Sequence, residues 1–187
     1  LVIACMQADI ERDLPDTAFP VRQRRVAGDA LPLARARNEA AAAARHEGLV
    51  FLDVDCIPSP ALVGRYRAAL AREAALYMGE VHYLPAGAVR LNAAGTPGFD
   101  RLDALGVDHP ARPTIGADRI VAEADPGRLW GLSFALTHAD HDRAGGFDEI
   151  YEGYGGEETD YAWRLAAAGI PFYWLGGARA WHQHHPL

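Results

Sequence analysis

A nearly continuous apolar run, LVFLDV at residues 49–54, constrains the fold more than any other feature of the sequence. A strand with one face in water alternates apolar and polar residues, and this run does not. The run therefore predicts a central parallel strand that helices cover on both faces. An alanine-rich helical segment precedes it at 33–47, and a second helical segment, which Ser59 would cap, follows at 59–73.

The rest of the chain continues this alternation of strands and helices. We predict a single α/β domain over residues 1–187, with a mostly parallel central sheet flanked by helices. Residues 85–128 interrupt the pattern because they are rich in Gly, Pro, Asp and Arg, and we expect one short helix there, near 99–105. Further strands are expected at 1–6, 21–26, 75–84, 132–137, 171–176 and 178–182, and further helices at 138–146 and 157–169.

Charge and hydropathy limit the partners of the chain. The formal net charge of −7 argues against a nucleic-acid-binding surface. No apolar run approaches the roughly 20 residues of a membrane span, so we expect no integral membrane segment. Both cysteines, Cys5 and Cys56, lie in apolar runs and are expected to be buried thiols. We therefore expect the protein in the cytoplasm, or peripherally at a membrane.

Two aspartates, Asp53 and Asp55, close the apolar run at 49–54. In open α/β sheets, ligands bind beyond the carboxyl ends of the strands. Alternation along a strand would place both carboxylates on the same side, where they repel each other. A divalent cation, Mn²⁺ or Mg²⁺, would neutralise them and keep positions open for phosphate oxygens. The alternative is a turn at the strand end, in which Asp55 accepts hydrogen bonds from backbone amides.

A second cluster, GGFDEIYEGYGGEETDYAWRL at residues 145–165, combines glycines, aromatic residues and acids. Its glycines allow the backbone to come close to a ligand, and Tyr151 and Tyr154 offer flat faces on which a sugar ring can stack. Glu157 and Glu158 lie at the start of the helix expected at 157–169. The alternative for both acids is structural, because the helix macrodipole favours acids near a helix N-terminus.

The third cluster is ARAWHQHHP at residues 178–186. His182 ends an apolar strand and is a candidate third ligand for the metal; the alternative is a solvated, histidine-rich chain end. His184 and His185 are expected on an exposed tail. His138 and His141, three residues apart at a helix start, are expected at the surface.

In this order, the three clusters resemble inverting glycosyltransferases of the GT-A fold, the nucleotide-diphospho-sugar transferase fold. Family two is the closest, and the beta-galactosyltransferase family shares the pattern. FLDVDCIP resembles their metal-binding D-x-D strand, the segment at 145–165 resembles their acceptor and base segment, and ARAWHQHHP resembles the terminal strand whose histidine completes the metal site. ARARNEAAAA, at 34–43, is similar to the helix before the D-x-D strand, which carries an Arg-Asn pair. The resemblance covers about residues 1–84 and 129–185.

The resemblance implies a role for each matching residue. Asp55 and His182 would bind the metal directly, and Asp53 would reach the ribose, or the metal through water. Glu158 would be the catalytic base and Glu157 would hold acceptor hydroxyls. The base position carries glutamate where the family has aspartate, which leaves the choice between these two acids open. The residues implied to bind the donor also include Arg37, Asn38, Trp130 and Gly131, and those implied to bind the acceptor are Tyr154, Gly155, Gly156 and Asp160.

The family's first β-α unit has no counterpart, so the chain is expected to begin at the second strand of the fold. These expectations together describe a metal-dependent inverting glycosyltransferase. It would move a sugar from a nucleotide-diphosphate donor, with a UDP-sugar as the expected donor, to a hydroxyl of a saccharide or other acceptor. Two other classes stay open. A nucleotidyltransferase also uses paired aspartates and a metal, and a non-catalytic, truncated module would bind saccharide or nucleotide without turnover.

Overall fold

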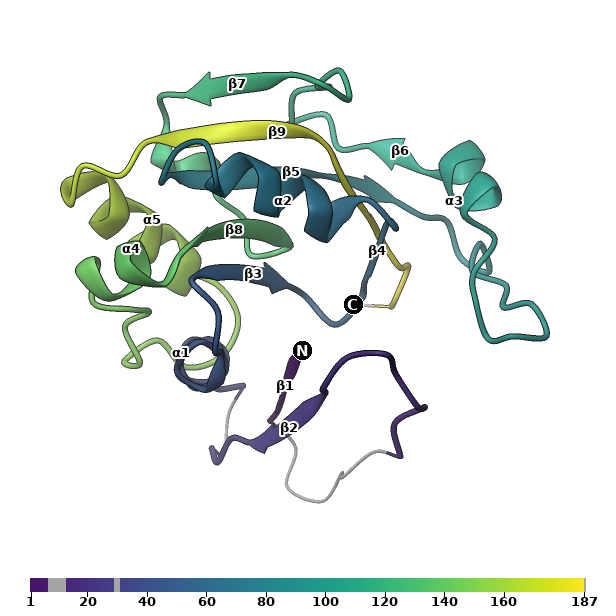
Figure 1. The fold of residues 1–187 in the computed structure, drawn as a ribbon, viewed down its shortest axis with the longest axis horizontal. Coiled ribbons are helices and arrows are strands. Elements are labelled where there is room, and N and C mark those ends of the chain that lie inside the picture. Colours follow the sequence, from purple (N-terminus) through teal and green to yellow (C-terminus); the bar gives the residue numbers. More distant parts are fainter. Residues whose placement is uncertain (7–12, 29–30, 187) are drawn as a thin grey trace.

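The computed structural model describes residues 1–6, 13–28 and 31–186 of the chain. Near the N-terminus, β1 (Val2–Cys5) and β2 (Arg22–Arg25) form a small parallel sheet of their own. This sheet lies beside α1 (Leu33–Ala43) and apart from the main sheet, as Figure 1 shows. Strands were expected at both positions, and both are present.

The main sheet has seven strands in the described residues and carries most of the core. The central path runs from β3 through β8, β5 and β9 to β4, while β6 pairs with β5 and β7 pairs with β9. The strands are β3 (Gly48–Leu52), β4 (Cys56–Pro58), β5 (Leu76–Tyr83), β6 (Val107–Asp108), β7 (Ile120–Glu123), β8 (Ser133–Thr137) and β9 (Phe172–His182).

The direction of the strands differs from the expectation of a mostly parallel sheet. Within the described part of the main sheet, β5 and β9 form the parallel pair, and the other pairings are antiparallel. Strands β3 and β5 still point the same way, because both run antiparallel to β8, which lies between them. The five residues of β8 are all buried, and a strand covered on both faces shows the same apolar run whichever way it points. Hydropathy therefore located this strand but gave no information on its direction.

Helices cover the sheet at the expected places, with shifted ends. They are α1, α2 (Leu62–Leu70), α3 (Phe99–Leu105), α4 (His138–Arg143) and α5 (Glu157–Ala167), with a 3₁₀ turn at Pro126–Arg128. The short helix expected near 99–105 is confirmed, whereas α1 ends at Ala43 rather than at 47. Ser59 does not cap α2, which begins after Ala61 without a side-chain cap. No helix in the described ranges is long and apolar enough to span a membrane.

The last strand is longer than expected. Two short strands were expected, at 171–176 and 178–182, and one strand of 11 residues, β9, replaces them. Its register against β5 shifts at Gly176–Gly177, opposite Gly79 and Glu80. Added methyl groups at Gly176 and Gly177 would overlap the backbone of residues 116–117, so this glycine pair lets the loop before β7 lie directly on the strand.

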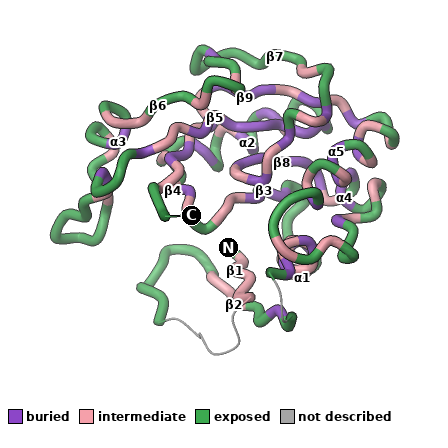
Figure 2. Tube along the Cα trace, turned by 180° about the vertical axis from the view of Figure 1, so that it is seen from behind, coloured by how far each residue is buried: buried purple, intermediate pink, exposed green. Residues whose placement is uncertain are grey.

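Consecutive residues of the central strands face two different hydrophobic clusters, which confirms that both faces of the sheet are covered. Leu76 and Phe134 belong to the cluster that also contains residues of α1 and α5. Tyr77 and Ala135 belong to the cluster that contains residues of α2. Figure 2 shows the buried residues concentrated along β5, β8 and β9.

The sheet curls strongly at one end, and this curl builds the site. Strands β3 and β4 lie at opposite ends of the central path, yet only residues 53–55 connect them. Five strands in a flat sheet would place these edges about 19 Å apart, at about 4.8 Å per step. The connection instead closes as a tight turn, in which the Cys56 amide donates to the Asp53 carbonyl at 3.0 Å. The far end of β9 therefore bends over to pair with β4, as Figure 1 shows.

Candidate functional site

The two aspartates lie in this turn rather than on the strand. Strand β3 ends at Leu52, so the expectation that Asp53 and Asp55 share one side of a strand is wrong. The Asp53 amide donates to the Leu132 carbonyl at 3.1 Å, and Val54 at the tip is 97% exposed. Because a turn rotates successive side chains away from each other, the two carboxylates reach different partners. Asp53 pairs with Arg37, and Asp55 pairs with histidines of the C-terminal segment.

Asp55 and two histidines form a candidate metal site. Asp55 Oδ2 lies 3.3 Å from His182 Nε2 and 3.4 Å from His185 Nε2. The three donor atoms lie within 4.8 Å of one another. The other carboxylate oxygen, Asp55 Oδ1, is buried and has no hydrogen-bond partner among the described residues. A buried carboxylate oxygen without a partner is costly, and a bound cation would remove that cost. The donor set therefore fits a divalent cation.

His185 was expected on an exposed tail and belongs to this group instead. The Gln183 amide donates to the Asp55 carbonyl at 2.8 Å, which ties the segment after β9 to the turn. This hydrogen bond brings His185 close to the Asp55 carboxylate, although half of the His185 side chain stays exposed. The H-x-x-H spacing of His182 and His185 was the only sequence signal for this arrangement. Asp53, which was implied as a further metal-binding residue, is not part of the group.

Arg37 connects the aspartate turn to the acids of α5. Its Nη1 lies 2.8 Å from Glu157 Oε1, and its Nη2 lies 3.2 Å from Asp53 Oδ1. The Arg37 side chain is 12% exposed and that of Glu157 3% exposed, so this ion pair is almost fully removed from water. A methyl group at Gly131 would overlap Arg37 Nη2. The missing side chain at Gly131 is therefore what allows the guanidinium to reach both carboxylates.

The two glutamates at the start of α5 have opposite pKa shifts. Burial, together with the hydrogen bond to Glu157 and the charge of Glu157, raises the pKa of Glu158 to about 7. Burial also opposes ionisation of Glu157, but its hydrogen bonds with Glu158 and Arg37 outweigh burial and lower its pKa. At neutral pH, Glu157 therefore holds the charge and Glu158 titrates. A carboxyl group with a pKa near neutrality suits a general base.

The segment before α5 is shaped by glycines and anchored to two helices. Gly155 and Gly156 have φ of +94° and +92°, a backbone conformation that favours glycine, and they leave Tyr154 92% exposed. Asp160, implied to bind the acceptor, pairs with Arg164 at 2.8 Å, and Arg164 also donates to the carbonyls of residues 144 and 146. Asp160 therefore serves to hold this segment against α5.

Asn38, implied to bind the donor, contacts the same segment. Its Nδ2 donates to the Phe147 carbonyl and to Glu149 Oε1, each at 2.9 Å, and its Oδ1 accepts from the Phe147 amide at 2.8 Å. His141, expected at the surface, is buried, and its Nδ1 lies 2.8 Å from the Tyr161 hydroxyl. Burial lowers the pKa of His141 to about 4. Asn38 of α1 therefore fixes the segment before α5, and His141 of α4 fixes α5 itself through Tyr161.

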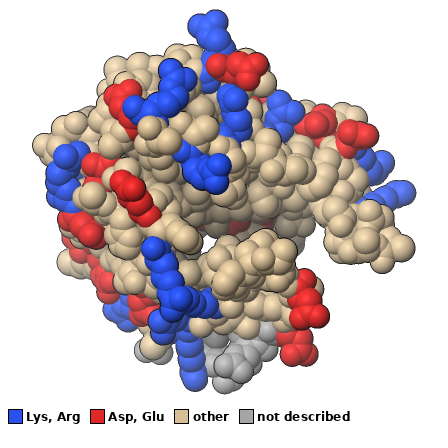
Figure 3. Space-filling model, in the orientation of Figure 1, with Lys and Arg blue, Asp and Glu red and all other residues tan. Residues whose placement is uncertain are grey.

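Trp130 lies just before β8 and continues a row of rings that leads to the candidate metal site. Its ring is 4.9 Å from that of His109, which is 5.4 Å from Tyr83, and Tyr83 is 4.9 Å from His182. Figure 3 shows a hollow between the part that carries β1 and β2 and the main body, with acidic atoms visible inside it.

The chain is similar in structure to a protein solved in a complex. The crystal structure of GalNAc-T7 with UDP, GalNAc and Mn²⁺ superposes with a TM-score of 0.62 at 15% sequence identity, over 88% of this chain and 32% of that chain. The fold is that of a GT-A glycosyltransferase. The expected GT-A fold class is thus confirmed, apart from the strand directions corrected above.

Comparisons of sequence point to glycosyltransferases over shorter stretches. The family described as the N-terminal domain of galactosyltransferase matches residues 112–185, less than half of the chain. Two validoxylamine A glucosyltransferases, from Streptomyces hygroscopicus subsp. jinggangensis (strain 5008) and subsp. limoneus, are each 49% identical over 43 residues. These matches cover 23% of this chain and 10% of each relative, so the chain matches only a small part of the length of those proteins.

Proposed function

We propose that this chain is a metal-dependent inverting glycosyltransferase domain. It would transfer a sugar from a nucleotide-diphosphate donor, a UDP-sugar, to a hydroxyl of a saccharide or other acceptor. The observation that carries the proposal is that Asp55, His182 and His185 lie together at the turn after β3. The first residue of this turn, Asp53, is connected to Glu157 through Arg37, which pairs with both. The names of the relatives support the same class, since two are glucosyltransferases and the structural neighbour, GalNAc-T7, was solved with UDP, GalNAc and Mn²⁺.

Asp55, His182 and His185 would hold the metal ion. Mg²⁺ prefers an all-oxygen environment, whereas Mn²⁺ accepts imidazole nitrogen together with carboxylate oxygen, so this donor set favours Mn²⁺. A divalent cation bound there would act as a Lewis acid that neutralises charge on the departing diphosphate.

Glu158 would act as the base. Its carboxylate takes the proton of the acceptor hydroxyl as that oxygen attacks the anomeric carbon from the face opposite the leaving diphosphate. A single displacement of this kind inverts the configuration. Glu157 stays ionised against Arg37 and accepts hydrogen bonds from other acceptor hydroxyls. Tyr154, which is almost fully exposed and lies three residues before Glu157 in the chain, would offer its ring to the acceptor sugar.

A comparison of three matched substitutions tests the base. Glu158→Gln should lower turnover by about 10²–10⁴-fold, because a positioned general base contributes that much. Its affinity for the UDP-sugar, measured by calorimetry with Mn²⁺, should stay unchanged. Glu157→Gln should mainly raise the acceptor KM and lower stability. Glu152→Gln, an exposed acid in the same segment, is the control and should behave like the parent.

The products of the same assay separate the classes of function. Release of UDP together with glycosylated acceptor or free sugar is the expected result. Formation of pyrophosphate would indicate a nucleotidyltransferase, and UDP-sugar binding without turnover across acceptors would indicate a binding module. Full turnover in Glu158→Gln would show that the base is assigned wrongly.

Two substitutions within the group test the metal site. Asp55→Asn and His185→Ala should weaken Mn²⁺ binding, measured by electron paramagnetic resonance of free Mn²⁺. His184→Ala removes an exposed neighbouring histidine outside the group and should leave the affinity as in the parent. Parent-like Mn²⁺ affinity in Asp55→Asn would contradict the proposed site.

A further inference from the structure

Tyr83, the last residue of β5, packs on the candidate metal ligand His182. The two residues are partners in the register of β5 and β9, and their ring centroids lie 4.9 Å apart, with 33° between the ring planes. The Tyr83 ring also contacts the ring of His109, at 5.4 Å. Tyr83 therefore lies between a residue of the candidate metal site and the irregular stretch at 85–128.

The backbone of His182 is fixed on both sides, whereas its imidazole is not fixed by hydrogen bonds. The backbone pairs with Cys56 of β4, and its carbonyl accepts a hydrogen bond from the Leu84 amide at 3.0 Å. The ring lies 3.3 Å from Asp55 Oδ2 through its Nε2, and among the described residues no hydrogen bond reaches its Nδ1. Metal-ligating histidines usually donate this second nitrogen to a carboxylate or a carbonyl, which orients the ring. In this chain, ring packing is left to orient it.

Tyr83 is a rigid support for such packing. At this position β5 lies between two other strands, since Tyr83 pairs with Val107 of β6 on one side and with His182 of β9 on the other. Side chains placed by strands are held more precisely than side chains placed by loops. The remaining ring neighbour of His182 is His185, at 5.4 Å, whose side chain is half exposed. Tyr83 is thus the better restrained of the two rings that contact His182.

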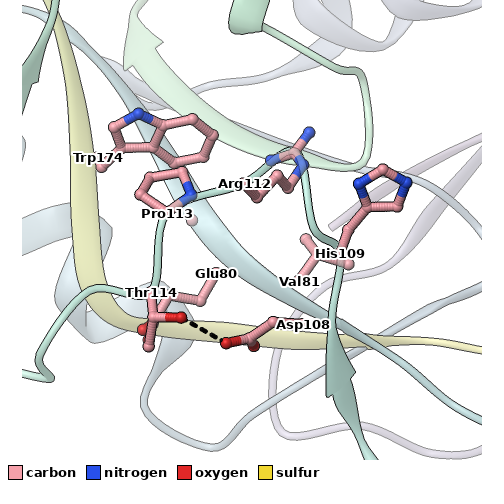
Figure 4. Close-up of a pocket in the computed structure, with 9 residues that line it drawn as sticks. Glu80, Val81, Asp108, His109, Arg112, Pro113, Thr114 and Trp174 are labelled. Atoms are coloured by element: carbon pink, nitrogen blue, oxygen red, sulfur yellow. Dashed lines mark hydrogen bonds between the residues drawn. The ribbon is translucent and has the colours of Figure 1, made fainter.

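His109 supports Tyr83 from the far side. The Ala111 amide donates to His109 Nδ1 at 3.1 Å, and the edge of the His109 ring contacts Trp130 at 4.9 Å, so this imidazole has a fixed orientation. The loop that carries it is closed by a hydrogen bond of 2.6 Å from the Thr114 hydroxyl to Asp108, which Figure 4 draws beside His109. The stretch at 85–128 therefore reaches the candidate metal site through a row of packed rings.

We propose that Tyr83 is a positioning residue for the metal site. Its ring, supported by His109, holds the His182 imidazole with Nε2 directed toward Asp55 and the cation. Without this ring, His182 could occupy other rotamers, and metal binding would have to order it. The inference rests on the proposed function, because it takes His182 as a metal ligand.

Mn²⁺ affinities of matched variants test the inference, measured by electron paramagnetic resonance of free Mn²⁺. Tyr83→Leu should weaken binding by about 10- to 100-fold, the usual effect of removing a residue that orients a metal ligand. Tyr83→Phe keeps the ring and should bind like the parent. The control is Tyr173→Leu, which removes another half-buried tyrosine of the sheet near the other end of β9, stacked on Tyr77 at 5.6 Å. This control should also bind like the parent.

A double-mutant cycle with His182→Ala separates positioning from a general structural effect. Asp55 and His185 remain in His182→Ala and give a residual affinity. If Tyr83 acts through the His182 ring, Tyr83→Leu should cause no further loss in the His182→Ala background. An equal loss in both backgrounds would refute the inference, since it would show that Tyr83 acts without His182.

The outcomes also distinguish this inference from the proposed function. Parent-like Mn²⁺ affinity in Tyr83→Leu would overturn the inference while the proposed function stands. If the parent itself binds no Mn²⁺, the proposed metal site fails and the inference fails with it. Should Tyr83→Leu not fold, His109→Ala decides: weaker Mn²⁺ binding than in the parent would support the row of rings, and parent-like binding would refute it.

Discussion

Replacement of Arg37 by methionine gives the sharpest test of how the site is built. Arg37 is 12% exposed and bridges Asp53 and Glu157, the latter 3% exposed. Removal of one partner from a buried ion pair leaves the other charge uncompensated, which costs about 3–5 kcal/mol. The matched control is Arg35→Met in the same helix, since Arg35 pairs with Glu149 while 38% and 42% of their side chains are exposed. Exposed pairs contribute about 0–1 kcal/mol.

The loss in Arg37→Met should depend on pH, and the sign follows from Glu157. In the parent, the pKa of Glu157 is lowered, so its contribution to stability is present above its unfolded pKa and is lost as the pH falls through the folded pKa. In Arg37→Met, burial is left to raise the pKa of Glu157, so protonation at lower pH relieves the buried charge. The parent's contribution is the same at pH 5 and pH 8, because both values lie above the unfolded pKa of 4.5, so the relief of the buried charge in Arg37→Met is what makes the difference in unfolding free energy larger at pH 8 than at pH 5.

Urea denaturation followed by tryptophan fluorescence at the two pH values measures these differences. We expect a loss of about 3–5 kcal/mol for Arg37→Met at pH 8, a smaller loss at pH 5, and less than about 1 kcal/mol for Arg35→Met at both. A loss below about 1 kcal/mol for Arg37→Met, or an equal loss at both pH values, would refute the reasoning about the buried bridge.

Four further predictions concern packing, the catalytic base and the acceptor side. Gly79→Ala should destabilise the domain by about 3 kcal/mol in urea denaturation, because a methyl group there overlaps the Tyr66 hydroxyl and the Ala178 carbonyl. Gly64→Ala, with open space around it in α2, should instead stabilise it by about 1 kcal/mol, and a loss there would contradict this account. Turnover should fall as the pH drops below about 7, where Glu158 takes up a proton, and Glu158→Gln should lack this limb of the profile. Tyr154→Ala should raise the acceptor KM while it changes the unfolding free energy by less than about 0.5 kcal/mol, and an unchanged KM would remove Tyr154 from the acceptor site.

Local patterns in the sequence were enough to identify most of the elements and the fold class. The apolar runs located β3, β5 and β8, and the alanine-rich segment located α1. Helix ends were less well predicted: α1 stops at Ala43, although helix-forming residues continue, because the chain must turn back into β3. Strand β4 and the short strands β6 and β7 were missed, since β4 lies next to the prolines at 58 and 60, and β6 and β7 lie in the Gly- and Pro-rich stretch at 85–128.

The sequence by itself determined which residue types are present and which short segments carry them, including the acids of the aspartate turn and of α5. Only the tertiary structure decided the partners: Asp55 with His185, and Arg37 with both Asp53 and Glu157. The physical reason is that hydropathy and propensity act between near neighbours in the chain. The distance between Asp55 and His185 depends instead on how far the sheet curls at the end of β9, which the packing of the whole domain sets.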